Sequence, residues 1–350
     1  MTNPSETIKA PPFAVERGRN VDLPAVSVVA IGRNEGQRLV ACLESIKASD
    51  YPAERLELIY VDTNSTDESC SAAERLGAKV IRIQPEFPSA AAARNAGLRE
   101  ATHDLVHFLD GDTVLDAFWL RKAVETMRDP TIVCVFGRRE EMAPTATVYN
   151  FWTHHDWYVS PGSTGACGGD ALFRREALET VGGYDAGLIA GEERDLCFRL
   201  LRDSDVSIIR LDEPMTMHDI HMTRFSQYWK RCFRSGYAYA QVASRYKGLR
   251  AWRRTCYRNV AHAAITLVAI ISSITIGSWW PLAVWLALAF AAILRGAFRH
   301  RAQVGGMGGA ILYALHHYLS KAPIVLGHAD FALRSVFKGK PKTLVEYRDG

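Results

Sequence analysis

Short apolar runs alternate with helical patterns along the first half of this 350-residue chain. Five runs rich in β-branched residues are typical of strands, namely Val26 to Ile31, Leu56 to Val61, Lys79 to Ile83, Asp104 to Leu109 and Ile132 to Gly137. Helical spacing follows the first run, in Leu39, Cys42, Leu43 and Ile46, and Ser65-Thr66-Asp67-Glu68 has the form of a capping box that opens the next helix. Strands that alternate with helices predict an α/β fold with a mostly parallel sheet and right-handed crossovers.

Two aspartates, Asp110 and Asp112, follow the apolar run that ends at Leu109. The carboxyl end of a strand in a parallel sheet is the place where open α/β proteins bind their ligands. Two carboxylates held this close repel each other unless a hard divalent cation lies between them and a polyanion, such as a nucleotide diphosphate. A pair of solvated loop acids is the alternative, because Asp and Gly are ordinary turn residues.

Four further polar motifs occur in order around Asp110-Gly111-Asp112. They are Arg33-Asn34-Glu35, Val61 to Asp67, Ala93 to Gly97, and Gly191 to Leu196. The ordered series of five resembles glycosyltransferase family 2, the inverting nucleotide-sugar transferases of the GT-A fold, in a membrane-associated bacterial-type form. The resemblance covers roughly Val26 to His218. The full set is far more specific than any member, because each short motif alone is also a common helix cap.

The resemblance implies a nucleotide-sugar pocket for a UDP- or GDP-sugar donor. It assigns this pocket to Arg33, Glu35, Asp62, Arg94 and Asp110. A carboxylate such as Asp62 can accept hydrogen bonds from a base edge, Glu35 suits ribose hydroxyls, and Arg94 offers a planar fork of donors. The alternatives are that Glu35 caps its own helix and that Arg94 lies on the surface of an alanine-rich helix.

The resemblance also implies a site for Mg2+ or Mn2+ at Asp110, Asp112 and His218. The ion acts as a Lewis acid that neutralises charge on the departing nucleotide. His218 resembles the late histidine that some GT-A enzymes add to the metal site, and a structural histidine is the alternative. The glycine-rich stretch that contains Gly169 and Asp170 corresponds to the sugar and acceptor site of relatives, because glycines let backbone approach a substrate closely. A plain loop is the other interpretation.

Inversion in one step needs a base that takes the proton from the acceptor hydroxyl. The family provides this base as the Asp of a Glu-Asp pair at the start of a helix. This chain has Glu192-Glu193 instead, so the aligned base is Glu193. The departure matters, because a misplacement of about 1 Å can cost on the order of a hundredfold in rate. Glu192 as the base, or two acids that only stabilise the helix dipole, are the alternatives.

No charged residue occurs from Val260 to Leu294. This stretch is long enough for two short crossings of about 17 residues each, and Gly277 to Pro281 supplies a turn in its middle. Arginines precede it and follow it, so the positive-inside rule predicts that both flanks lie in the cytoplasm. The sequence therefore predicts a transmembrane hairpin, with a re-entrant or buried helical pair as the alternative.

The segments on either side of this hairpin are amphipathic. A helix from about Thr223 has an aromatic face and a second face with Gln227 and Lys230, which suits either a bilayer interface or packing on the domain. The later apolar stretch Gly308 to Leu326 is interrupted by His316, His317 and Lys321. It is expected to be interfacial, with both histidines at headgroup level or in a core rather than on a metal.

The predicted organisation has five parts. They are a flexible segment 1–24, the GT-A domain 25–222, an interfacial helix with a basic linker 223–258, the hairpin 259–297, and a C-terminal interfacial helix with a tail 298–350. The basic residues gather beside the apolar stretch, which favours a membrane surface over nucleic acid. Seven scattered cysteines indicate reduced thiols, and the first residues lack a signal-peptide core, so we expect an inner-membrane protein whose catalytic domain is cytoplasmic.

The predicted function is transfer of a sugar from a nucleotide-diphosphate sugar to a hydroxyl of a membrane-associated acceptor, a saccharide or lipid-linked intermediate, in glycan or polysaccharide synthesis. Gln227 to Arg231 lacks the Gln-x-x-Arg-Trp order of processive synthases, so we expect a single transfer. A catalytically weakened GT-A protein that serves as a membrane scaffold is the alternative, and Glu193 is its one sequence hint. The glycine-rich motifs of nucleotidyltransferases and dinucleotide oxidoreductases are missing from the first strand.

Overall fold

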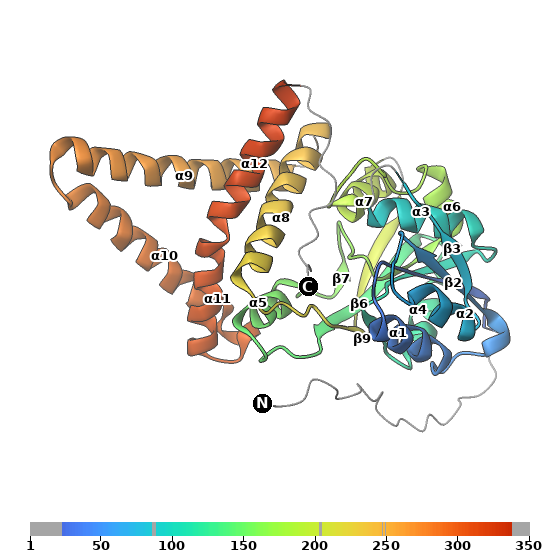
Figure 1. The fold of residues 1–350 in the computed structure, drawn as a ribbon. Coiled ribbons are helices and arrows are strands. Elements are labelled where there is room, and N and C mark those ends of the chain that lie inside the picture. Colours follow the sequence, from blue (N-terminus) through green and yellow to red (C-terminus); the bar gives the residue numbers. More distant parts are fainter. Residues whose placement is uncertain (1–22, 86–88, 203–204, 247, 249, 338–350) are drawn as a thin grey trace. The chain divides into compact units, whose positions relative to one another are not determined.

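The computed structural model describes residues 23–85, 89–202, 205–246, 248 and 250–337 (Figure 1). Almost all of the segment 1–24, expected to be flexible, lies outside these residues. The chain divides into two compact units. The sheet unit consists of Met1–Ala143, Trp157–Gly187 and Glu192–Ile220, and the helical unit consists of Pro144–Asp156, Leu188–Gly191 and His221–Gly350.

The sheet unit contains every strand that the sequence predicts. Its strands are β1 (Val26–Gly32), β2 (Leu56–Asp62), β3 (Lys79–Arg82), β4 (Leu105–Asp110), β5 (Thr113–Leu115), β6 (Ile132–Glu141), β7 (Gly162–Ser163), β8 (Ala171–Arg174) and β9 (Ser207–His218). Its helices are α1 (Gln37–Lys47), the 3-10 turn Ala53–Arg55, α2 (Ser69–Arg75), α3 (Ala90–Glu100), α4 (Trp119–Thr126), α6 (Arg175–Thr180) and α7 (Glu192–Arg202). The predicted α/β architecture is therefore confirmed.

The sheet is mixed, with the strand order β3-β2-β1-β4-β8-β6-β9-β5 and β7 beside β9. The pairs among β3, β2, β1 and β4 are parallel, as expected from the alternation of strands and helices. In the second half, β8 runs antiparallel to β4 and β6, and β5 and β7 run antiparallel to β9. β6 and β9 are parallel again. The expectation of a mostly parallel sheet therefore holds for the first four strands and for this pair, and it fails for the short strands β5, β7 and β8, because the direction of a short strand depends on tertiary connections and not on its own sequence.

The register of the central strands aligns the polar motifs. β1 is buried along almost its whole length, as expected for a strand between two neighbours with helices over the sheet. Gly32 at its end pairs with Asp62, and Ile31 pairs with Asp110. The carboxyl ends of β1, β2 and β4 therefore lie at one edge of the sheet, together with the motifs that follow them.

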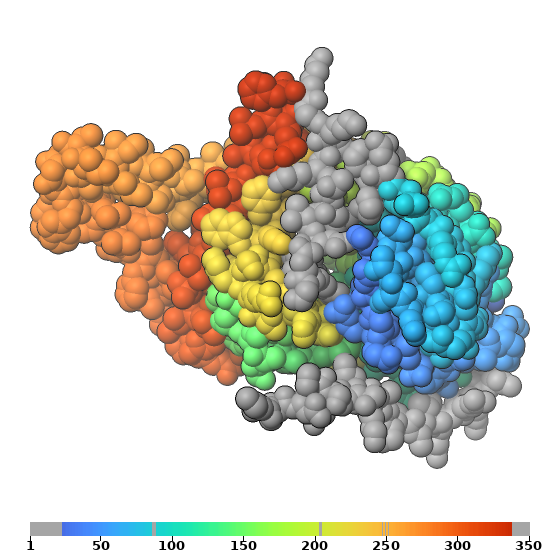
Figure 2. All heavy atoms as spheres, in the orientation of Figure 1, coloured from blue at the N-terminus to red at the C-terminus, as the bar shows by residue number. Residues whose placement is uncertain are grey.

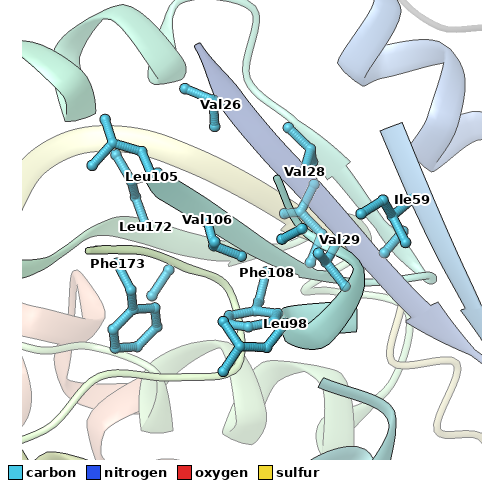
Figure 3. Packing of buried hydrophobic residues seen from close by; sticks show 14 of the residues in the cluster. Val26, Val28, Val29, Ile59, Leu98, Leu105, Val106, Phe108, Leu172 and Phe173 are labelled. Carbon is cyan, nitrogen blue, oxygen red and sulfur yellow. The ribbon is translucent and has the colours of Figure 1, made fainter. Parts of the chain in front are cut away.

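The core of this unit lies between the sheet and its helices (Figure 3). At Gly97, α3 approaches β1 so closely that a Cβ would lie 2.2 Å from Val29 Cγ1. Trp119 of α4 is fully buried, and its indole Nε1 donates to His107 Nε2 at 2.7 Å. Burial lowers the pKa of His107 to about 4, so the ring is neutral and can accept this bond at neutral pH. All seven cysteines are free, as predicted.

The capping box predicted at Ser65 to Glu68 does not form. α2 begins at Ser69, and its N-cap residue Glu68 makes no side-chain cap. The hydroxyl of Ser65 donates to Asp62 instead, and the backbone N of Ser65 donates to Asp62 Oδ2 at 2.9 Å. These local hydrogen bonds to the Asp62 carboxylate organise the loop after β2, and α2 therefore begins only at Ser69.

The helical unit consists of α5 (Val148–Asp156), α8 (Phe225–Arg245), α9 (Arg250–Ile276), α10 (Trp280–Val304), α11 (Met307–Leu319) and α12 (Lys321–Val336). The expected C-terminal interfacial helix is thus two helices, separated at Ser320. α5 was expected within the GT-A domain, yet it packs in the helical unit. Trp152 Nε1 donates to the carbonyl of Leu312 at 3.0 Å, and His316 lies buried against Asp156 at 2.9 Å. Such partners lie about 160 residues apart, so local sequence cannot indicate them.

The aromatic face of α8 packs on α12. Backbones meet where a Cβ at Gly236 would lie 2.1 Å from the carbonyl oxygen of Ile324, and one at Gly327 would lie 2.2 Å from that of Phe233. His328 Nδ1 donates to the Gly236 carbonyl at 2.7 Å. Protein therefore covers much of this face of α8, for which the sequence left two alternatives, a bilayer interface and packing on the domain.

A pair of helices, α9 and α10, occupies the region of the predicted transmembrane hairpin. Trp252–Ile276 and Trp280–Val304, 25 residues each, are long and apolar enough to cross a membrane. The structure buries only 11% and 6% of their most apolar windows, so these helices expose their apolar side chains, unlike the core helix of a globular domain. The turn between them contains Gly277, with φ of 66°. In Figure 2 this hairpin, in orange, projects from the yellow and red helices of the same unit.

Candidate active site

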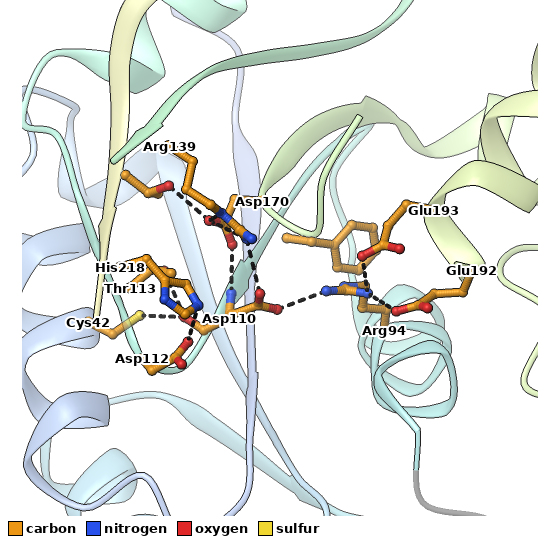
Figure 4. Close-up of polar contacts among 12 residues, drawn as sticks. Cys42, Arg94, Asp110, Asp112, Thr113, Arg139, Asp170, Glu192, Glu193 and His218 are labelled. Carbon is orange, nitrogen blue, oxygen red and sulfur yellow. Dashed lines mark hydrogen bonds and ion pairs between the residues drawn. The ribbon is translucent and has the colours of Figure 1, made fainter. Parts of the chain in front are cut away.

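Three potential metal ligands meet at the carboxyl ends of β4 and β9 (Figure 4). The ligand atoms of Asp110, Asp112 and His218 all lie within 4.8 Å of one another, and His218 Nε2 is 3.3 Å from Asp112 Oδ1. Asp112 and His218 are both buried. The pairing of β5 with β9 brings them together, because Thr113 lies opposite His218 in the register. The structure thus assembles the three residues that the sequence predicted as a metal site.

Asp170 supports this cluster from within the core. It is fully buried, and its Oδ1 accepts a hydrogen bond from the backbone N of Asp110 at 2.9 Å. Its Oδ2 accepts from Thr216 Oγ1 at 2.8 Å and from Arg139 Nε at 3.0 Å. Burial raises the pKa of Asp170. Both oxygens are engaged in the core, where the side chain fixes the backbone of Asp110, and the acceptor contact expected for Asp170 stays a prediction.

Arg139, at the end of β6, is a site residue that sequence reasoning missed. Its Nη2 lies 3.1 Å from Asp110 Oδ2 and 2.8 Å from Asp170 Oδ2, and its guanidinium lies 5.4 Å from the ring centroid of Trp157. The ring of Trp157 in turn lies 5.0 Å from that of His218. The available signal was the position of Arg139 just after a predicted strand, at the sheet edge that carries the other motifs.

Arg94 of α3 connects the cluster of Asp110, Asp112 and His218 with α7. Its side chain is 2% exposed, and Nη2 donates to Asp110 Oδ1 at 2.8 Å. Nη1 donates to Glu192 Oε1 at 3.0 Å and lies 3.6 Å from Glu193 Oε1. Burial lowers the pKa of Arg94, but these carboxylates outweigh burial and raise it well above its usual value. The alternative of a surface arginine is therefore wrong.

Neighbouring residues hold Arg94 in this position. Asn95 binds the backbone of Tyr184 through two hydrogen bonds. Its Nδ2 donates to the carbonyl of Tyr184 at 2.7 Å, and its Oδ1 accepts from the Tyr184 N at 2.8 Å. The guanidinium lies 5.5 Å from the ring centroid of Tyr184. The lack of a side chain at Gly169 provides space for the Arg94 guanidinium, since a Cβ there would lie 2.2 Å from Arg94 Nη2. The expected contact of Gly169 with sugar or acceptor stays a prediction.

The two acids that open α7 have different surroundings. Glu192 is buried and paired with Arg94, whereas the side chain of Glu193 keeps 23% of its surface exposed. Burial and the negative charge of Glu192 raise the pKa of Glu193 to about 7. A carboxylate that titrates near neutral pH suits general base catalysis. This difference favours Glu193 over Glu192 as the base.

The pKa of Asp110, unlike that of Glu193, is lowered by its neighbours. Burial raises its pKa, but Arg94 and Arg139 together lower it well below the usual range. Asp110 is therefore ionised at all physiological pH values, the form in which a carboxylate binds a cation.

The residues predicted for the nucleotide lie at the same sheet edge. Asp62 ends β2 and is 2% exposed, and Tyr60 donates to its carboxylate at 3.1 Å. Glu35 Cγ lies near the Asp110-Gly111-Asp112 turn, since it is 3.4 Å from the position of a Cβ at Gly111. Glu35 is not the N-cap of α1, which is Gly36, and its Oε2 pairs with Nη2 of Arg38 in the first turn at 2.9 Å. Arg33 is exposed in the loop after β1.

Comparison with known proteins agrees with this geometry. The model of the family described as Glycosyl transferase family 2 matches residues 27–182. Glycosyltransferase AglE of Haloferax volcanii is 27% identical over 229 residues, which cover 63% of this chain and 74% of the relative. The beta-monoglucosyldiacylglycerol synthase of Synechocystis sp. is 27% identical over 211 residues, which cover 55% of this chain and 43% of the relative.

A solved structure shows the same fold. It is the mannosyltransferase PcManGT from Pyrobaculum calidifontis, determined in complex with GDP-Man and Mn2+. The TM-score is 0.60 at 22% identity, and the match covers 87% of this chain and 90% of that chain. The sheet unit therefore has the GT-A fold. This chain is a glycosyltransferase, and over residues 27–182 its sheet unit is similar to glycosyltransferase family 2.

Proposed function

We propose that this glycosyltransferase moves a sugar, with inversion, from a nucleotide-diphosphate sugar to a hydroxyl of a membrane-associated acceptor. The observation that supports it most is Arg94, which contacts Asp110 of the metal cluster and both glutamates of α7. One buried side chain thus fixes the spacing between the residues that would bind the diphosphate and the residue that would accept a proton. An inverting transfer needs this spacing, because the leaving group and the attacking hydroxyl lie on opposite faces of the sugar.

Asp110, Asp112 and His218 would hold the metal ion. Two carboxylates and one imidazole suit Mg2+ or Mn2+, and the nitrogen donor favours Mn2+. Once bound, the ion supplies a Lewis acid for the negative charge that develops on the departing diphosphate. The chain itself contributes the orientation, because Asp170 fixes the backbone of Asp110.

Glu193 would accept the proton of the acceptor hydroxyl. Its raised pKa makes it a stronger base than an ordinary carboxylate, while it is still largely ionised above neutral pH. Glu192, which stays paired with Arg94, would position the helix rather than react. On the donor side, Arg33, Glu35 and Asp62 would bind the nucleotide, and Gly169 would line the sugar site.

We infer a membrane location with the sheet unit in the cytoplasm. The apolar, exposed α9 and α10 support the location, and the arginines on both flanks support the orientation. A lipid or lipid-linked saccharide acceptor fits this location. It is in keeping with the Synechocystis relative, whose name gives a diacylglycerol glycolipid. Since the processive motif is missing, we propose a single transfer.

Membranes that contain the full chain provide the test. They are incubated with radiolabelled UDP- and GDP-sugars and Mn2+, and the organic phase is then analysed for labelled lipid. We expect Mn2+-dependent transfer of one sugar, with the opposite anomeric configuration from that of the donor by NMR. A long polymer or retained configuration would contradict the proposal. Donor binding without transfer or hydrolysis, with or without Mn2+, would favour the scaffold alternative.

A further inference from the structure

The helical unit has a large excess of positive charge. From His221 to Phe337 the sequence contains fifteen lysines and arginines and one acid, Asp330. Asp330 pairs with Arg334 at 3.0 Å. The acid of α5, Asp156, accepts hydrogen bonds from Tyr313 and His316, each at 2.9 Å. Both carboxylates within the described part of this unit are thus already engaged.

Two basic side chains of this unit, His262 and Lys321, lie beside the ring of Tyr318, and with Arg258 of α9 we call them the basic cluster. Arg258 and His262 are four residues apart on α9 and so share one helix face. Lys321 opens α12, and its Nζ lies 5.2 Å from the ring centroid of Tyr318. The ring of His262 lies 5.3 Å from the same ring, and 5.9 Å from that of Trp285.

The cluster holds like charges together. α9, which carries Arg258, packs against α12, which Lys321 opens. Burial lowers the pKa of Lys321, and the positive charge of Arg258 lowers it further. Within the ranges that the structure describes, no carboxylate pairs with Arg258 or Lys321. Repulsion of this kind in partly desolvated surroundings is relieved by a bound anion.

The cluster also lies where charged surface gives way to apolar surface. Arg258 is the last charged residue of α9, and none follows until Arg295. The next turns of α9 expose apolar side chains, among them Ile265 at 58% and Val268 at 62%. The adjoining aromatic rings of Tyr318 and Trp285 are of the type enriched at membrane interfaces. This boundary is the level at which lipid headgroups lie.

We propose that Arg258, His262 and Lys321 form a binding site for the phosphate of an anionic phospholipid headgroup. A phosphate accepts charge-assisted hydrogen bonds from guanidinium, ammonium and imidazole groups, and its negative charge removes their mutual repulsion. The cation–π contact with Tyr318 and the packing of α9 against α12 hold the donors in place before the lipid arrives. The inference rests on the proposed membrane location, but none of its residues belongs to the candidate active site.

The test uses the full chain, purified in a neutral detergent. Thermal unfolding is followed with dioctanoyl-phosphatidylglycerol, with dioctanoyl-phosphatidylcholine and with inorganic phosphate. We expect phosphatidylglycerol to raise the unfolding temperature in a saturable way, by about 5 °C at a hundredfold excess over its Kd. Phosphatidylcholine should give no saturable shift. An equal shift with inorganic phosphate would overturn the assignment to a lipid.

Variants separate this site from general surface charge. Lys321→Gln and Arg258→Gln should each weaken phosphatidylglycerol binding about tenfold or more, since each removes a charged partner of the phosphate. Lys321→Arg should keep binding, which guards against a variant that merely fails to fold. Arg299→Gln is the matched control, because Arg299 is exposed on the same hairpin and loses the same charge.

The proposal is wrong if Lys321→Gln and Arg258→Gln bind phosphatidylglycerol as well as Arg299→Gln does. Its failure can be told apart from failure of the proposed function, because lipid binding is measured without donor or metal. A chain that binds phosphatidylglycerol but transfers no sugar contradicts only the proposed function.

Discussion

Arg94 is the residue on which the proposed chemistry depends most. Its two terminal nitrogens contact acids from different elements, Asp110 at 2.8 Å and Glu192 at 3.0 Å. The sequence assigned Arg94 to the nucleotide pocket through its motif. It could not reveal the contact with Glu192, which joins residues 98 positions apart. Arg139 and the supporting role of Asp170 escaped prediction for the same reason, because burial and partners are tertiary properties.

Glu193→Gln is expected to lower turnover by about a hundredfold to ten-thousandfold, because glutamine cannot take the proton of the acceptor. Donor binding should persist, which isothermal titration with Mn2+ and nucleotide sugar can measure. The fold should also persist. The folded protein raises the pKa of Glu193 from 4.5 to about 7, so ionisation of this residue disfavours folding as pH rises through that window. A neutral glutamine is therefore at least as stable at pH 8.

Glu192→Gln is the matched control for this substitution. It should lose less turnover, because Glu192 positions α7 through Arg94. A larger loss in Glu192→Gln than in Glu193→Gln would move the base by one residue.

The pH dependence gives a second prediction for Glu193. Only the ionised form can accept a proton, so kcat/KM should fall about tenfold per pH unit below about pH 7. The negative charge of Glu192 contributes to the raised pKa, so Glu192→Gln should move this acidic limb to lower pH. Steady-state rates between pH 5 and pH 9 measure both effects. A flat profile down to pH 5 would rule out a base with this pKa.

Asp112→Ala is expected to abolish metal-dependent transfer, because it removes one of three ligands whose atoms lie within 4.8 Å. A Mn2+ titration of the transfer rate measures this loss, with circular dichroism as the check on folding. Asp212→Ala is the control, since Asp212 is an exposed acid on the strand that carries His218. Transfer near the wild-type rate in Asp112→Ala would refute the metal role.

At the scale of elements, prediction succeeded where local pattern decides the structure. β1, β2 and β4 are mostly apolar runs, each interrupted by one interior polar residue, because helices cover the sheet, and such runs can be recognised in the sequence. β8 and β5 are only four and three residues long, and their antiparallel pairing follows from distant partners. The place of α5 in the helical unit depends on Leu312 and His316 in the same way.

The crossing of α8 and α12 gives a prediction about packing. Gly327→Ala should lower stability by about 2 kcal/mol, because its Cβ would lie 2.2 Å from a backbone oxygen of α8 and force the helices apart. Gly308→Ala on α11 is the matched control. Its Cβ would meet nothing within 4 Å, so alanine should raise stability by about 1 kcal/mol. Thermal unfolding in detergent compares the two. Equal effects would mean that the close contact does not form.

At the scale of the whole molecule, charge and apolar surface divide between the two units. The predicted nucleotide, metal and base residues all lie in the sheet unit, whereas the apolar hairpin and the excess of basic residues lie in the helical unit. A GT-A fold alone needs no exposed apolar helices, and exposed surface of this kind marks contact with a membrane or a partner. The fifteen basic residues beside it favour the membrane.

This division predicts a defined topology for the chain. If both flanks of the hairpin are cytoplasmic, the turn between α9 and α10 crosses to the opposite side. Ser278→Cys should therefore react with a membrane-impermeant maleimide added to intact cells, and the unaltered chain should not. Its native cysteines lie in the sheet unit or on α8 and α9, with Cys256 before the uncharged stretch. The chain should also stay in the membrane after an alkaline carbonate wash, which releases peripheral proteins. Labelling of Ser278→Cys only after the membrane is opened would mean that the hairpin enters and leaves on the cytoplasmic side, as a re-entrant pair.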